Sequence, residues 1–180
     1  MRDGDSPPLP TTANDEPSFP RQGRLAGVDF GTVRIGIAVC DPLRILVSPL
    51  EIRQVSDPQR DAEYFRQLAD REAIDGFVVG LPIHCDGGES EKSVEARRFA
   101  RWLSESTEVP VRLFDERFTT SAAQSRTRGA KGGGKRSRHR RVDAIAAQVL
   151  LESYLEAAKY RDELPGQSAA GPAIGEAAID

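Results

Sequence analysis

The sequence predicts a mixed α/β domain in which an antiparallel meander is followed by parallel strands. Three apolar segments, 24–29, 34–40 and 45–52, are separated by short turns that contain Gly or Pro, as is typical of strands joined by hairpins. Two later apolar runs, 75–82 and 109–114, have the length and Val content of buried strands. Helical patterns follow and separate these runs. We therefore expect a five-stranded mixed sheet with helices on both faces.

Four helices are expected from their capping residues and apolar spacing. Asp57 and Pro58 begin the first helix, because Asp is a favourable N-cap and Pro is tolerated at the first helical position. The second helix begins near Ser90 and carries apolar residues every three or four positions. The third is expected at about 120–128. The last is expected from about 141 to 159, after a Gly-rich basic segment.

The folded body is expected at 24–160, between two tails. Residues 1–23 contain five prolines and few branched apolar side chains. Residues 161–180 are rich in Ala, Gly and Pro. Neither segment can bury enough apolar surface to offset the entropy of ordering, so both are predicted to be disordered.

Composition excludes several classes of protein and indicates a partner. The apolar runs are too short to span a membrane, and the N-terminus lacks the apolar core of a secretory signal. Two cysteines exclude a disulfide scaffold, and we expect a cytoplasmic protein. The net charge is −3, yet residues 117–142 hold nine Lys and Arg and no acid. Such a stretch predicts contact with a polyanion.

Three acids are expected to meet at one edge of the sheet. Asp29 ends the first strand, Glu116 follows the strand at 109–114, and Asp143 is in the first turn of the last helix. Each also has a simpler interpretation, as a turn residue, a solvated loop acid or a partner of the helix dipole. Together they would repel one another unless a cation offset their charge. Carboxylate oxygens suit Mg²⁺ or Mn²⁺.

Four ordered blocks of sequence resemble the YqgF family, Holliday-junction-resolvase-like proteins of the ribonuclease H-like superfamily. Members of this family are also described as nucleases that mature the 5′ end of pre-16S ribosomal RNA. The blocks cover nearly all of 24–158. They are GVDFGTVRIGIAVCD (27–41), VVGLPIHCDGGES (78–90), DERFTTSAA (115–123) and VDAIAAQVLLESYL (142–155).

The resemblance implies a ribonuclease H-like fold and a metal-dependent nuclease. Carried over by position, Asp29, Glu116 and Asp143 would be the catalytic acids and would bind Mg²⁺ or Mn²⁺. Water would attack a backbone phosphate and leave a 5′-phosphate and a 3′-hydroxyl. Arg117 of the DER motif is interpreted as a phosphate contact, and Arg34 as structural. The resemblance favours a ribosomal RNA precursor as the substrate, with a four-way DNA junction as the alternative.

The basic segment 129–141 is interpreted as a mobile loop that contacts nucleic acid. Its motif GAKGGGKR departs from a phosphate-binding P-loop at Arg136, where Ser or Thr is required, and it does not follow a strand. Its cations would bind phosphates without reading sequence. The residues expected to do so are Lys131, Lys135, Arg136, Arg138, Arg140 and Arg141.

Two other functions stay open from the sequence. The first is a non-catalytic nucleic-acid-binding module, against which the presence of all three acids argues. The second is an ATPase or sugar kinase of the actin-like class, because the motif DFGT at 29–32 resembles the first phosphate loop of that class. Those enzymes need two such domains, and the folded body here is long enough for one. The sequence does not predict the oligomeric state.

Overall fold

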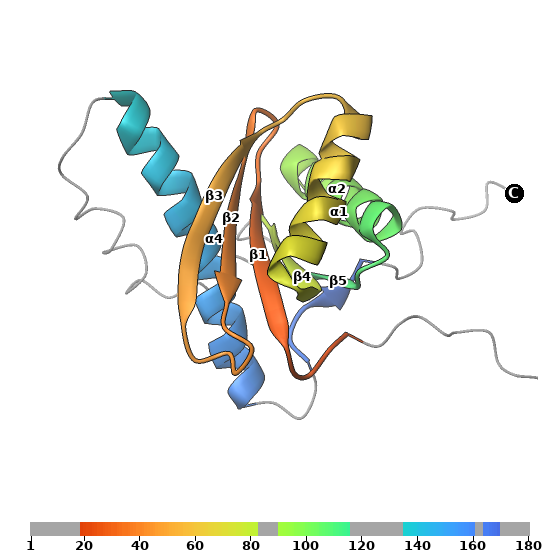
Figure 1. The fold of residues 1–180 in the computed structure, drawn as a ribbon, viewed down its shortest axis with the longest axis vertical. Coiled ribbons are helices and arrows are strands. Elements are labelled where there is room, and N and C mark those ends of the chain that lie inside the picture. Colours follow the sequence, from red (N-terminus) through yellow and green to blue (C-terminus); the bar gives the residue numbers. More distant parts are fainter. Residues whose placement is uncertain (1–18, 83–89, 116–134, 161–163, 170–180) are drawn as a thin grey trace, which may run out of the picture.

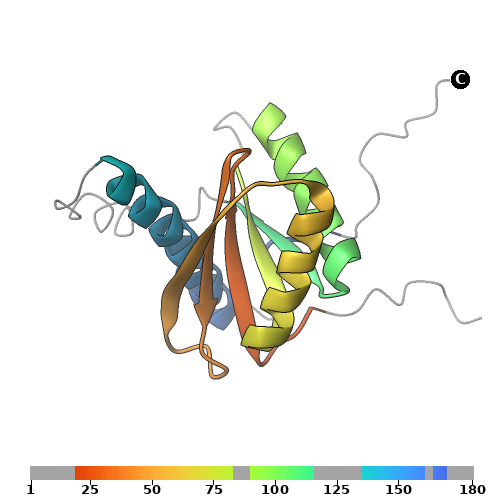
Figure 2. The ribbon, with the colours of Figure 1, turned by 45° about the horizontal axis from the view of Figure 1, so that its top comes forward.

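The computed structural model describes residues 19–82, 90–115, 135–160 and 164–169. Within them, a mixed sheet is covered by α1 and α2 on one face and by α4 on the other (Figures 1 and 2). The strand order is β3-β2-β1-β4-β5-β6. Strands β1, β4 and β5 are parallel, whereas β2, β3 and β6 run antiparallel to their neighbours.

The meander comprises β1 (Arg24–Phe30), β2 (Arg34–Cys40) and β3 (Val47–Gln54). The third strand begins two residues later than expected, and Ile45 and Leu46 are exposed in the preceding turn. The cause is Asp41, whose carboxylate accepts hydrogen bonds from three backbone N–H groups of this turn and holds it outside the sheet.

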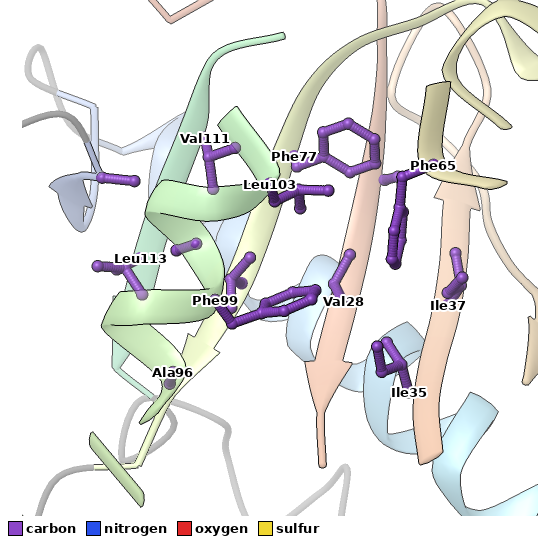
Figure 3. Packing of buried hydrophobic residues seen from close by; sticks show 14 of the residues in the cluster. Val28, Ile35, Ile37, Phe65, Phe77, Ala96, Phe99, Leu103, Val111 and Leu113 are labelled. Carbon is purple, nitrogen blue, oxygen red and sulfur yellow. The ribbon is translucent and has the colours of Figure 1, made fainter. Parts of the chain in front are cut away.

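The helices of the first face pack on the central strands. Asp57 accepts a hydrogen bond from the backbone N–H of Arg60 and caps α1 (Pro58–Glu72), as expected. Strand β4 (Ile74–Leu81) follows directly. Ser90 caps α2 (Glu91–Thr107), which leads to β5 (Val111–Asp115). Figure 3 shows Phe65 and Phe99 directed from these helices onto the sheet, where both belong to the larger apolar cluster.

The second face is covered by α4 (Lys135–Lys159), which packs across β1, β2 and β3. The expected start of this helix at 141 was wrong, because the helix begins six residues earlier. Lys and Arg favour helix, and the chain contains neither Gly nor Pro from Lys135 to Lys159. The helix expected at 120–128 lies outside the described residues.

Both ends of the packed body extend beyond the expected range of 24–160. Phe19 is buried against Tyr154, with ring centroids 6.0 Å apart. At the other end, β6 (Gln167–Ser168) pairs with β5, so the sheet has six strands rather than the five expected. Arg112 holds the approach to β6 by donating hydrogen bonds to the carbonyls of Leu164, Pro165 and Gly166.

No helix in the described parts of the chain is long and apolar enough to cross a membrane.

Candidate active site

Asp29 lies one residue before the end of β1, on the face of the sheet that α4 covers. Side chains alternate along a strand. Leu25 belongs to the apolar cluster beneath α4, whereas Ala26 and Val28 belong to the cluster beneath α1 and α2. Asp29 shares the face of Leu25 and is half-buried.

The strand positions on both sides of Asp29 are glycines. Gly36 of β2 is its antiparallel partner. On the other side, Val28 pairs with Val79, so the parallel register brings Gly80 of β4 level with Asp29. Neither glycine contributes a side chain on this face. Sequence analysis did not single out these glycines. The sequence did contain a signal for them, because an isolated Gly inside a strand often marks a place where a ligand or another backbone approaches closely.

A third glycine sets the position of α4 over β1. A Cβ atom at Gly27 would lie 2.8 Å from the carbonyl oxygen of Ala147 and 2.8 Å from Cβ of Leu151. Leu25, further back along β1, clusters with Leu151 and Tyr154. The helix therefore runs antiparallel to β1.

This direction carries the backbone of α4 from Ala147 to Asp143 towards the end of the sheet at which Asp29 lies. Asp143 precedes Ala147 by four residues, which is about 6 Å along a helix. Asp29 follows Gly27 by two residues, which is about 6.7 Å along a strand. From their common contact at Gly27, both backbones run towards the edge of the sheet where β1 ends, and α4 also crosses β2 and β3. Figure 1 shows the N-terminal end of α4 on the side where β1 ends.

The other predicted site residues are placed only in part. Glu116 and Arg117 lie outside the described residues. The preceding strand ends at Asp115, opposite Leu81 of β4, at the same edge as the end of β1. Among the side chains that the structure describes, no group of three or more His, Cys, Asp or Glu could hold a metal ion. Of the three predicted acids, only Asp29 has a side chain among those described.

The basic segment is placed differently from the expected loop. Lys131 lies outside the described residues. The remaining five cations belong to the first two turns of α4, next to Asp143. They are therefore carried on regular helical backbone rather than on a Gly-rich loop. These five are Lys135, Arg136, Arg138, Arg140 and Arg141.

In this sheet, β1 has an antiparallel neighbour on one side and a parallel neighbour on the other, and α4 packs against it. This arrangement is the ribonuclease H-like fold that the sequence predicts. Residues 23–157 match the model of a protein family described as "RuvX: Holliday junction resolvase". The chain belongs to this RuvX/YqgF family.

Two relatives agree with this membership. The chain is 62% identical over 156 residues to a Rhodopirellula baltica protein named "Putative pre-16S rRNA nuclease", covering 87% of this chain and 90% of the relative. A protein of the same name from Mycobacteroides abscessus is 42% identical over 152 residues, covering 82% and 89%. A solved structure, "T. thermophilus RuvC in complex with Holliday junction substrate", matches with a TM-score of 0.49 and 15% identity, covering 81% of this chain and 99% of the other.

Proposed function

We propose that this protein is a divalent-metal-dependent nuclease that hydrolyses phosphodiester bonds in structured RNA, and that it acts in 5′-end maturation of pre-16S ribosomal RNA. The nuclease assignment is supported by membership of the family and by the direction of α4, which runs from its contact at Gly27 towards the edge of the sheet where Asp29 lies. The names of the relatives support the RNA substrate. The cytoplasm, where ribosomal RNA is processed, is the compartment that goes with this role.

The donor chemistry at this edge fits a hard cation. Asp29 offers carboxylate oxygens, the ligands that Mg²⁺ and Mn²⁺ prefer. Its neighbours on the two adjacent strands are glycines, which place no side chain beside it. We assign Glu116 and Asp143 as the further ligands. A divalent ion bound there would supply Lewis-acid stabilisation of the charge that develops on the phosphate.

The protein itself would position the substrate. The cations on the first two turns of α4 lie next to Asp143 along the helix, so a strand that pairs with them is led towards the acids. Arg117 directly follows Glu116 in the sequence and is assigned to a phosphate near the site. These contacts bind backbone and would not select a base sequence.

The test is cleavage of a 5′-extended pre-16S RNA by purified protein in Mg²⁺ or Mn²⁺, with a chelator as the blank. Asp29→Asn keeps the shape of the side chain but removes the charge that holds the ion. We expect it to lower kcat by at least about a hundredfold, with substrate binding retained. Asp70→Asn is the matched control, because Asp70 is exposed on α1 and far along the chain from the site. Equal cleavage by Asp29→Asn and wild type would exclude this site.

A second candidate function is resolution of four-way DNA junctions, which the description of the family favours. A synthetic junction assayed beside the RNA separates the two. Cleavage of the RNA alone supports the proposed substrate, whereas symmetric cleavage of the junction alone supports a resolvase. Metal-independent binding of either without cleavage would indicate a non-catalytic module.

A further inference from the structure

A hollow of about 360 Å³ opens beside the candidate active site, on the opposite face of the sheet. It lies between the end of β1, the start of β2 and the helices α1 and α2. A second hollow of about 290 Å³ shares Pro58 and Trp102 with it, so the two adjoin along the boundary between α1 and α2. The residues that line the first hollow include Phe30, Thr32, Val55, Arg98, Phe99 and Trp102.

The hollow is adjacent to the site because Phe30 directly follows Asp29. Consecutive Cα atoms are about 3.8 Å apart, and their side chains point to opposite faces. Asp29 therefore faces α4, and Phe30 faces the hollow. Thr32, in the turn that leads to β2, lies on the rim. A nucleic-acid strand that crosses the edge of the sheet at Asp29 has a neighbouring nucleotide within reach of the hollow.

The inner wall of the hollow is aromatic. Phe30 and Phe99 are stacked, with centroids 4.4 Å apart and ring planes 19° apart. Trp102 lies against Phe99 at 5.6 Å and is only partly buried. Figure 3 shows Phe99 extending from α2 towards β1. A planar, apolar group of the size of a nucleobase is what such a wall accommodates, since bases stack on aromatic side chains whatever their identity.

The charges around the hollow suit a phosphate that follows a base. Arg98 is exposed on its rim, and within the described residues no ion pair engages it. The one buried acid of the wall, Asp61, accepts hydrogen bonds from Arg53 and from the backbone N–H of Ser56. Its charge is offset and would not repel a phosphate. Glu95, also on the rim, offers an acceptor for an exocyclic amino group.

We propose that this hollow binds one base of the substrate strand, next to the phosphodiester that is cleaved, while Arg98 pairs with a flanking phosphate. The inference rests on the proposed function and adds a subsite to it. The volume falls within the roughly 300–1,000 Å³ of small-molecule sites, which is sufficient for one nucleoside. The subsite would fix where the strand lies relative to Asp29.

Trp102 makes the proposal directly measurable, because it is the only tryptophan of the chain. The Asp29→Asn protein in Mg²⁺ is titrated with a short single-stranded oligoribonucleotide while the tryptophan emission is recorded. A second oligonucleotide of equal length and charge carries abasic positions at its centre. We expect the first to quench the emission and to bind about tenfold more tightly, as the stacking of one base implies. The abasic strand should leave the emission nearly unchanged.

A pair of charge reversals tests the rim. Arg98 and Arg101 are both exposed on α2, but only Arg98 lines the hollow. Arg98→Glu should weaken binding of the intact oligonucleotide about tenfold, whereas Arg101→Glu should change it by less than about twofold. Equal quenching by the intact and abasic strands, or equal losses for the two variants, would overturn the proposal. Since the assay requires no cleavage, its failure is distinguishable from failure of the nuclease assignment.

Discussion

Helix α4 approaches the sheet closely at Gly27, and the substitution Gly27→Ala tests whether this approach sets the geometry of the site. The added Cβ would lie 2.8 Å from both the Ala147 oxygen and the Leu151 Cβ, whereas ordinary van der Waals separation begins at 3.4 Å. Because the oxygen belongs to the backbone, no side-chain rotation relieves it. The helix must move away from β1 by several tenths of an ångström.

Whether Gly27→Ala raises or lowers the free energy of unfolding shows whether α4 and β1 are closely packed at Gly27. Where a strand has space, replacing Gly by Ala stabilises a protein by about 0.4–1 kcal/mol, because the unfolded chain loses freedom. Where the core is overpacked, the substitution costs about 1–3 kcal/mol. We expect Gly27→Ala to be destabilising by the second amount. Urea denaturation followed by circular dichroism, with an unchanged m-value, measures it.

Cleavage supplies a second measurement on the same variant. Asp29 follows Gly27 on β1, and Asp143 precedes Ala147 on α4, so a shift of the helix changes their separation. A misplacement of about 1 Å can cost about a hundredfold in rate. We therefore expect kcat to fall at least about tenfold under conditions in which Gly27→Ala is fully folded. A variant that is more stable than wild type and equally active would refute the inferred register.

Two further predictions concern α4. The first replaces four of its N-terminal cations by Gln: Lys135, Arg136, Arg138 and Arg140. The slope of log K against log salt should fall by about 0.9 for each duplex phosphate that the variant no longer neutralises. An unchanged slope in binding titrations would show that these residues do not bind the nucleic-acid backbone. Burial raises the pKa of Tyr154 to about 12, and among the described residues its buried hydroxyl has no hydrogen-bond partner. Because the unfolded chain loses this proton near pH 10 and the folded chain near pH 12, stability falls as pH rises through that interval. Tyr154→Phe should therefore lose less stability than wild type between pH 10 and pH 12. At pH 7 it should change the free energy of unfolding by less than about 1 kcal/mol. Urea denaturation at neutral and alkaline pH measures both.

The sequence predicts most of the central sheet because its strands carry local signals. The hairpin of β1 and β2 and the caps of α1 and α2 depend on residues close in the chain, and the structure confirms them. The strand β6 has only two residues and is held by Arg112, more than fifty positions away, so no local pattern indicates it. The early start of α4 was missed because the interpretation of the basic segment as a Gly-rich loop was extended past Gly134, where the glycines end.

The candidate site was predictable as a set of residue types but not as a geometry. The strand end indicates Asp29 as a candidate acid at the edge of the sheet where β1 ends. Asp143 was expected in the first turn of the last helix, but α4 begins at Lys135, so Asp143 lies in its third turn. The distance between the two residues depends on the packing of α4 against Gly27, a tertiary contact that the sequence pattern does not predict. The hollow beside Phe30 was missed for a similar reason. The spacing of Phe99 and Trp102 predicts the buried side of a helix, but it does not indicate whether the packed side chains leave a hollow.

The glycines around Asp29 carry a structural cost that packing alone does not explain. Each Gly inside a strand is less favourable than Ala by roughly 0.5–1 kcal/mol. Gly27 is required by the close approach of α4. Gly36 and Gly80 flank Asp29 on the two neighbouring strands and place no side chain beside it on its face of the sheet. A core would fill such positions with Val or Ile. Under the proposed nuclease function, the absence of side chains at Gly36 and Gly80 would let an ion and a phosphate reach Asp29, whereas the packing of α4 accounts for Gly27.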